Sequence, residues 1–281
     1  MSSIAYITDS KLLELHRLHN HKTMNFWRLS NKINFTDFYV NDLVFFLSKD
    51  KEHMKGKEKG IVGFGRLKNI NQSSVKSMWK KYGNLNGYNT LEEFKETIIK
   101  NSKDKKLPEK ISSFYLENVT FFQPIYLSEC GFNISTNVES YIYLKNEEVV
   151  IKLLELAKKN KDIWSQLSEE EIDNEELLFS INSIHNKIKD LELPKKANKI
   201  LKQYKENKHY EFIQNSKNEL YSINGNDIKI VFYHDKDVDE RLLIGQARLY
   251  KHYLSLYYPK EVNTTFYTSD NNEFINYLLN N

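Results

Sequence analysis

The sequence predicts an α+β protein whose two halves follow different folding patterns. Residues 1–150 contain short hydrophobic runs of mixed pattern, which are typical of strands, and one helical excursion interrupts them. From Glu147 the spacing of apolar residues changes to that of amphipathic helices, and strands and helices alternate after them. We therefore expect a small β-barrel with a helical insertion, then a helical connector, then an α/β domain.

Proline and the change of period place the boundaries between these parts. Pro194 follows two helical stretches and marks the end of the connector. The expected parts are a barrel at 1–146, a connector at 147–194 and an α/β domain at 195–281.

The barrel is expected to contain short strands in four stretches. The first two, 42–50 and 60–70, are separated by a lysine-rich turn. The stretch 112–127 predicts two more strands, because Pro124 lacks an amide donor and breaks or edges the second of them. The stretch 138–145 closes the series.

The insertion lies between the second and third strands and centres on the polar run MWKKYGNLNGYNTLEEF. Ser74 to Tyr82 predicts a short helix, which Gly83 ends with a positive φ. The Asn-Leu-Asn-Gly tract that follows predicts a tight turn, because Asn and Gly tolerate the left-handed region. Thr90 and Glu93 form a capping box for a second helix, at about 91–100.

The second half begins with two amphipathic helices, and Ser168 with Glu171 caps the second of them. A helix, three strands, a helix, a strand and a last helix are expected beyond Pro194. Their ranges are 195–207, 209–214, 219–224, 227–234, 239–257, 262–268 and 270–279.

Composition limits the class of protein. The chain has 281 residues, of which 40% are hydrophobic and 28% charged, as in globular domains. It has no apolar run of about 18 residues and no signal-peptide pattern, so we expect a cytoplasmic protein without a membrane partner. Cys130 is the single cysteine, which excludes an internal disulfide framework and a cysteine zinc site.

The net charge of +3 is unevenly distributed. Residues 1–145 hold 22 Lys and Arg against 15 Asp and Glu, a net of +7, whereas the remainder holds 19 against 23, a net of −4. A basic first half suits a polyanion such as nucleic acid. An uneven distribution of surface lysines by chance is the alternative.

Five landmarks follow one another in the first half of the chain. They are NFWRLS (25–30), NDLVFFL (41–47), GIVGFGRL (60–67), MWKKYGNLNG (78–87) and VTFFQPIYL (119–127). The most specific part is the set Trp79, Tyr82, Gly83, Asn84, Asn86 and Gly87. In this order the landmarks resemble the EVE/PUA-like domain at the N-terminus of modification-dependent HNH restriction endonucleases.

The resemblance implies a β-barrel that accepts a modified cytosine flipped out of double-stranded DNA. A flipped base needs aromatic stacking partners and polar groups for its pairing edge. The candidates for stacking are Phe26, Trp27, Trp79 and Tyr82, and the polar candidates are Arg28, Ser30 and Asn84. Packing in the hydrophobic core is the alternative role for each aromatic residue.

The second half lacks the histidine spacing of an HNH nuclease. It contains a Gln-xxx-Tyr pair, Gln246 and Tyr250, and Asp227 with Lys229 spells D-x-K. With the expected order of helices and strands, these residues faintly resemble the PD-(D/E)xK nuclease core, whose RecB-type members carry the Gln-xxx-Tyr motif. The alternative for Tyr250 is a purely structural role, in which it packs as part of the apolar face of its helix.

A turn at Gly225 and Asn226 would pair Glu219 with Phe232 and leave Asp227 at the turn, roughly 16 Å from Glu219. Any remaining catalytic site would therefore use candidates away from the turn, namely Glu219, His234, Gln246 and Tyr250.

The leading hypothesis is a DNA-binding protein that senses modified bases in a restriction or phage-defence system. It needs no cofactor, and its partners are modified double-stranded DNA and a partner subunit or second copy. One alternative is an active modification-dependent endonuclease that uses Mg²⁺, and another is a PUA-like RNA-binding protein.

Overall fold

The computed structural model describes residues 3–30, 34–52, 58–132, 138, 140–161, 167–188, 196–213, 216, 218–258 and 261–281. The predicted boundary at Pro194 and part of the lysine-rich turn lie outside these residues. The chain divides into two compact units, Met1–Ile172 and Asp173–Asn281, called unit 1 and unit 2 below. The predicted division into three functional parts stays a prediction.

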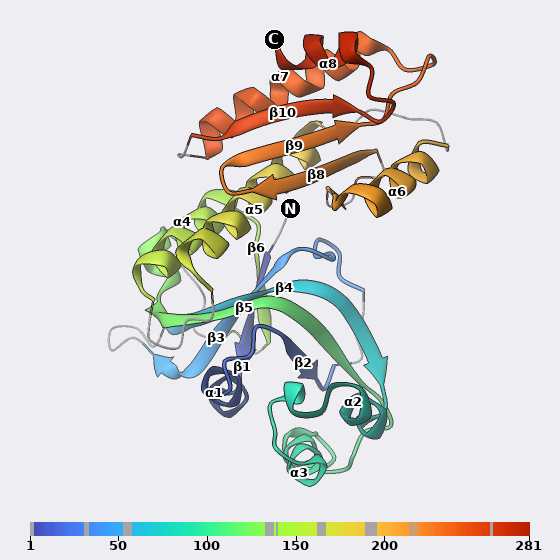
Figure 1. Ribbon diagram of the computed structural model, residues 1–281. Helices are drawn as coiled ribbons and strands as arrows, with labels where there is room; N and C mark the ends of the chain where they lie inside the picture. Colours follow the sequence, from blue (N-terminus) through green and yellow to red (C-terminus); the bar gives the residue numbers. More distant parts are fainter. Residues whose placement is uncertain are drawn as a thin grey trace. The chain divides into compact units, whose positions relative to one another are not determined.

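Unit 1 contains a six-stranded mixed sheet with the strand order β2-β5-β4-β3-β1-β6 (Figure 1). Strand β1 runs parallel to β3, and the other neighbours are antiparallel. The elements are β1 (Ser3–Thr8), α1 (Ser10–Leu18), β2 (Met24–Arg28), β3 (Leu43–Glu52), β4 (Lys59–Ser73), α2 (Val75–Tyr82), η1 (Gly83–Asn86), α3 (Leu91–Asn101), β5 (Ile111–Ile125), η2 (Leu127–Cys130), β6 (Tyr141–Leu144) and α4 (Glu147–Lys159).

The expectation of a closed barrel is corrected by this pairing. The first residues form a strand, β1, that the hydrophobic pattern did not assign, and β1 lies between β3 and β6. The sheet therefore ends at β6 on one side and β2 on the other, and no pairing among the described residues joins these two edges.

The two short strands expected at 112–127 are one long strand, β5. Its pairing with β4 shifts register between Gly63↔Phe121 and Ile61↔Ile125, so three β5 residues lie opposite one β4 residue. Pro124 lies in this irregularity, where its missing amide hydrogen removes no regular ladder bond.

The insertion is held by the predicted caps. The Ser74 side chain accepts a hydrogen bond from the backbone of Ser77 at the start of α2, and Gly83 ends that helix with φ 51°. At the start of α3 the Thr90 hydroxyl accepts from the Glu93 amide at 3.2 Å. Figure 1 shows α2 and α3 beside each other at one end of the long β4–β5 pair. The sequence predicts an insertion that is held in one shape, and the structure confirms it as a pair of capped helices.

Unit 2 contains a four-stranded sheet with the strand order β10-β9-β8-β7, in which β9 and β10 are parallel. The predicted order of elements after Pro194 is confirmed. The elements are α6 (Lys196–Lys208), β7 (Glu211–Phe212), β8 (Glu219–Asn224), β9 (Asp227–Phe232), α7 (Glu240–Tyr257), β10 (Asn263–Thr268) and α8 (Glu273–Asn280), and α5 (Glu169–Ile188) begins in unit 1 and contributes its later turns.

Helices pack against both faces of the sheet of unit 2, because successive side chains along its buried strands point to opposite faces. Ile228, Ile230 and Phe232 of β9 share a core with α5, α7 and α8. Val231 and Tyr233 point the other way and pack with α6. Among the described residues, no helix combines the length and the low polarity that crossing a bilayer requires.

Candidate functional site

The outer face of α2 carries exposed lysines. Lys76 and Lys80 are four residues apart, which places them on one side of the helix, and Lys81 follows. Their opposite side is anchored by the buried Val75 and Met78. None of the three lysines forms an ion pair with another described residue.

The insertion as a whole carries a net positive charge. Residues 74–110 hold nine lysines against five acidic residues, a net of +4. The loop after α3 exposes four of these lysines, namely Lys103, Lys105, Lys106 and Lys110. The insertion is therefore a capped, basic element rather than an electrically neutral flank.

Tyr82 and Asn84 lie at the surface of the insertion. The half-buried ring of Tyr82 stacks on Tyr115 of β5, with ring centroids 5.5 Å apart, and its hydroxyl accepts a hydrogen bond from Asn71 at 2.8 Å. Asn84 is exposed, and its carbonyl accepts from the Gly87 amide at 2.8 Å. These contacts fix the turn of the insertion against the sheet.

Trp27 and Trp79 both pack on Phe94 of α3. The ring centroids of Trp27 and Phe94 are 5.6 Å apart, and those of Trp79 and Phe94 are 5.9 Å apart. The indole N–H of Trp27 is buried and has no hydrogen-bond partner among the described residues. The two tryptophans thus join β2 and α2 to the core of the insertion.

Phe26 points to the opposite face of β2 and lies in the main core of unit 1. It is 3% exposed, and its ring stacks near Phe46 and Phe114 at centroid distances of 6.1 and 6.2 Å. A ring packed on both sides has no face open to a base, so Phe26 is a core residue in this structure.

Arg28 is buried on the same face as Phe26 and is surrounded by aromatic rings. Its guanidinium carbon lies 4.0 Å from the ring centre of Phe114 and 5.0 Å from that of Phe35. Its Nη2 donates to the Ser112 hydroxyl at 2.9 Å, and that hydroxyl donates to the carbonyl of Ser30. Burial lowers the pKa of Arg28, and contact with Tyr6 opposes that effect.

Two half-buried tyrosines, Tyr6 and Tyr141, border this aromatic cluster: the ring centre of Tyr6 lies 5.9 Å from the Arg28 guanidinium carbon, and the ring of Tyr141 lies 5.7 Å from that of Phe35. Their rings stack at 5.5 Å with 14° between their planes. These contacts bring Arg28 and Ser30 together with aromatic residues. The other candidates lie on the opposite face of β2 or in the insertion, namely Trp27, Trp79, Tyr82 and Asn84.

Sequence reasoning placed Asn86 in a landmark but did not predict that it ties the insertion to the sheet. Asn86 is fully buried; its side chain accepts from the Asn25 amide at 2.8 Å and donates to the Gly83 carbonyl at 2.7 Å. Asn25 is the residue before Phe26 in NFWRLS, so the first landmark and the Gly-Asn-x-Asn-Gly landmark meet in space. Only the co-occurrence of the two motifs in the sequence signals this contact.

In unit 2 two of the four catalytic candidates, Gln246 and Tyr250, converge on a third, the buried carboxylate of Glu219. Glu219 is 3% exposed and accepts hydrogen bonds from the Gln246 amide and, at 3.1 Å, from the Tyr250 hydroxyl. His185 of α5, which sequence spacing did not single out, also contacts Glu219 through Nδ1. Burial, and after it the nearby Glu219, raises the pKa of Tyr250 well above its usual value.

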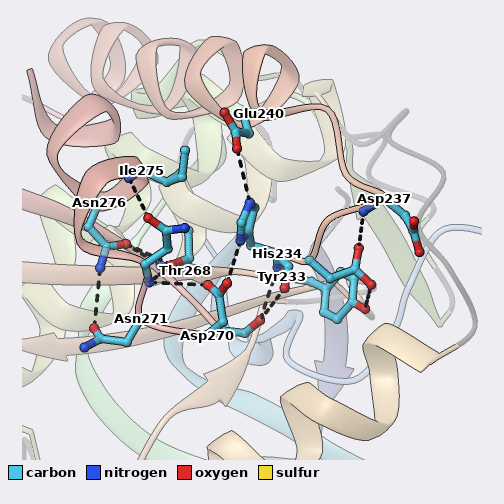
Figure 2. A network of polar contacts seen from close by, with 12 residues as sticks. Tyr233, His234, Asp237, Glu240, Thr268, Asp270, Asn271, Ile275 and Asn276 are labelled. Atoms are coloured by element: carbon cyan, nitrogen blue, oxygen red, sulfur yellow. Dashed lines mark hydrogen bonds and ion pairs between the residues drawn. The ribbon is translucent and has the colours of Figure 1, made fainter.

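His234, the fourth candidate, belongs to a different cluster. Figure 2 shows it between Asp270, whose carboxylate lies 2.8 Å from Nδ1, and Glu240, whose carboxylate lies 3.8 Å from Nε2. The His234 amide also donates to the Ser269 hydroxyl at 3.1 Å. These contacts join the end of β9 to the start of α7 and to the turn between β10 and α8.

The hairpin between β8 and β9 has the register predicted from its turn. Asn224 pairs with Asp227 and Glu219 pairs with Phe232, and Gly225 takes φ 58°. Asp227 therefore lies at the turn and Glu219 at the other end of the hairpin. No group of three or more His, Cys, Asp or Glu side chains in the described ranges is arranged to hold a metal ion as it stands.

Comparisons with known proteins give structural similarities only. No protein-family profile and no curated protein sequence matches the chain. Crystal structures of the ASCH protein from Zymomonas mobilis are similar to the N-terminal part, with a TM-score of 0.38, 17% identity, and coverage of 55% of this chain and 94% of that one. A single-residue variant of the same protein gives a TM-score of 0.39 and 16% identity, and the similarity covers 55% of this chain and 97% of that one. Similarities with TM-scores this low establish neither a family nor an activity.

Proposed function

We propose that the protein binds nucleic acid through unit 1 and that the lysines of the insertion contact phosphates. The observation that carries the proposal is the row of exposed lysines on α2, Lys76, Lys80 and Lys81, which form no ion pair with another described residue. Binding a phosphate there breaks no ion pair with a described residue and releases condensed counterions from the nucleic acid. Both ends of α2 are capped, so the row is presented on an ordered element.

The more specific form of this proposal is a reader of modified bases in double-stranded DNA, in a restriction or phage-defence system. The aromatic site around Arg28 supports it, because a flipped base costs a few kcal/mol and aromatic stacking returns about 1–3 kcal/mol. Tyr6 and Tyr141 are the half-buried rings of this site, and in this proposal they are the rings that such a base would contact. The sequence landmarks that include Arg28 favour the same use.

A modification-dependent endonuclease is the second candidate, because Glu219, Gln246 and Tyr250 converge as a nuclease core would bring them together. The residues do not fit Mg²⁺, however. Mg²⁺ takes several oxygen ligands in octahedral array, and Glu219 is a single carboxylate whose two oxygens already accept bonds from Gln246, Tyr250 and His185. We therefore propose that the function is recognition of nucleic acid rather than its cleavage.

The test is a charge reversal on α2 with a matched control on α6. Lys76→Glu with Lys80→Glu should weaken binding to a DNA duplex by at least about 10-fold and flatten the salt dependence, because two phosphate contacts are lost. Lys199→Glu with Lys202→Glu reverses two exposed lysines on one helix of unit 2 and should leave affinity unchanged. Fluorescence anisotropy over a series of salt concentrations measures both quantities.

The ligand panel separates the specific forms of the function. It contains duplexes that differ only in one cytosine modification, together with an unmodified structured RNA. Preference for one modified duplex supports the modified-base reader, and preference for the RNA supports an RNA-binding protein instead. Equal loss of affinity in the α2 and α6 variants would contradict the proposed interface.

A further inference from the structure

The outward side of α7 carries a row of exposed leucines. Leu242, Leu249 and Leu256 follow one another at seven-residue intervals and are 52%, 42% and 60% exposed. Seven residues make about two turns of an α-helix, so the three side chains lie along one line. The opposite side of α7 is buried in the core of unit 2. The row is therefore an apolar surface that the described part of the chain leaves open to solvent.

Gly245 lies on the same line, between Leu242 and Leu249, and its own chain does not account for it. It is exposed, and a Cβ there would meet no atom within 4 Å outside its own stretch of helix. Glycine inside a helix lowers helix stability relative to alanine, because it loses more backbone freedom on folding. Close approach of a second molecule explains the glycine, since the missing side chain leaves room for a neighbour.

Helix α8 enlarges this apolar surface. Phe274 and Tyr277 stand one turn apart on α8 and are 67% and 65% exposed. The buried residues of α7 and α8 share one core, so both helices cover the same face of the sheet (Figure 1). The two rings and the three leucines leave roughly 400 Å² of apolar surface uncovered. Homodimer interfaces are about 65% apolar, so this surface corresponds to roughly 600 Å² on each partner, the lower end of the range for specific interfaces.

We propose that this surface binds a second copy of the chain, with the two α7 helices antiparallel and crossing at Leu249. An interface on a two-fold axis has to be complementary to itself. The row meets this condition, because Leu242 and Leu256 lie seven residues from Leu249 on either side. A two-fold axis through Leu249 therefore pairs leucine with leucine. It also sets Gly245 opposite the exposed His252 of the second copy, so that a ring faces the position without a side chain.

The test measures the oligomeric state of the full chain in the absence of nucleic acid, so its result does not depend on the proposed function. Sedimentation equilibrium should show a reversible dimer in the micromolar range, as the modest area implies. Leu249→Lys brings two like charges together on the axis and should raise the Kd at least about 100-fold. Ile200→Lys, at an exposed apolar position on α6, is the matched control and should leave the Kd unchanged. Circular dichroism checks that each variant is folded.

Gly245→Ala should have two effects of opposite sign. The melting temperature of the monomer, measured on dilute protein, should rise, because alanine favours the helix and its Cβ has open space within the chain. Association should weaken about 10-fold, because the added methyl group occupies the space that the ring of the second copy needs. Unchanged or tighter association of this variant would contradict the close packing at Gly245.

Cysteine substitutions test the antiparallel arrangement. Leu249→Cys should cross-link two copies under mild oxidation, because a residue on the axis meets its own counterpart. Leu242→Cys should not, because its counterpart lies 14 residues away along the helix, about 21 Å, and a disulfide needs Cα atoms within about 7 Å. The wild type, whose Cys130 is buried, is the control. A monomeric wild type, a dimer that Leu249→Lys leaves intact or that Ile200→Lys weakens equally, or cross-linking of the Leu242→Cys variant instead of the Leu249→Cys variant would overturn the proposal.

Discussion

Trp27 lies where β2 meets the insertion, and a single substitution can separate its two possible roles. Its ring packs on Phe94 at 5.6 Å and near Tyr88 at 6.3 Å, while its neighbours Phe26 and Arg28 face the main core. This alternation follows from the two-residue period of a strand. The sequence NFWRLS therefore sends one aromatic ring into each of two cores.

We expect Trp27→Ala to lower the free energy of unfolding by about 3 kcal/mol, because it leaves a cavity between β2 and α3. Trp27→Phe keeps ring packing and should cost much less. Chemical denaturation measures both, and anisotropy with the preferred duplex measures binding. A loss of affinity of about 1–3 kcal/mol at unchanged stability would instead assign Trp27 to base stacking.

Individual residues of unit 2 show which contacts could and could not be predicted from the sequence. Gln246 and Tyr250 were chosen as candidates beside Glu219 because they match the Gln-xxx-Tyr motif, and the four-residue spacing of that motif places both on one face of a helix. His185 was not, because its contact with Glu219 depends on how α5 packs on the sheet, and no local pattern encodes that. His234 was assigned to the wrong neighbours for the same reason, since Asp270 reaches it from 36 residues away.

At the scale of elements, local chemistry predicted caps and turns well. The Thr90 cap, the Ser168–Glu171 capping box and the register of the β8–β9 hairpin are confirmed, because each depends on residues close in sequence. Strand β1 and the single long β5 were missed. Both are fixed by long-range pairing and by a bulge, which the hydrophobic pattern does not record.

The contact between α1 and the insertion gives a prediction for one glycine. Gly87 takes φ 86°, and a Cβ there would lie 2.8 Å from Cγ of Leu12 in α1. Gly87→Ala should therefore cost backbone strain and also displace α1, for a total loss of about 2–4 kcal/mol of stability.

Gly131→Ala is the matched control, because Gly131 takes φ 78° but has open space around its Cβ position. It should cost only about 1 kcal/mol, the strain of the left-handed backbone alone. Thermal unfolding of both variants measures the difference. Equal losses would show that α1 does not constrain the insertion through this contact.

At the scale of the whole molecule, the two units differ in what their polar side chains do. Unit 1 exposes lysines on an ordered insertion and buries Arg28 among aromatic rings. Unit 2 exposes lysines too, on α6, but its buried polar residues bond to one another within the fold, around Glu219 and around His234. The ordered, basic insertion is the reason that the proposed function assigns nucleic-acid binding to unit 1.

The last prediction is that the purified protein does not cleave DNA with Mg²⁺, on modified or unmodified duplexes. Cleavage by the predicted nuclease core needs converging carboxylates. Asp227 and Glu219 occupy opposite ends of the same hairpin, five rungs apart, which is roughly 16 Å. Phe232 lies opposite Glu219 and supplies no ligand. Glu219 is thus a structural acceptor that holds α5 and α7 to the sheet.

Glu219→Gln distinguishes these roles in one protein. If Glu219 is a structural hydrogen-bond acceptor, Glu219→Gln should lower the free energy of unfolding by about 1–3 kcal/mol, because Tyr250 and His185 lose a charged partner. DNA binding by unit 1 should be unchanged. If the wild type cuts a modified duplex in Mg²⁺, and Glu219→Gln or Asp227→Ala abolishes cutting in a folded protein, then the endonuclease is the correct function and a metal does reach this hairpin.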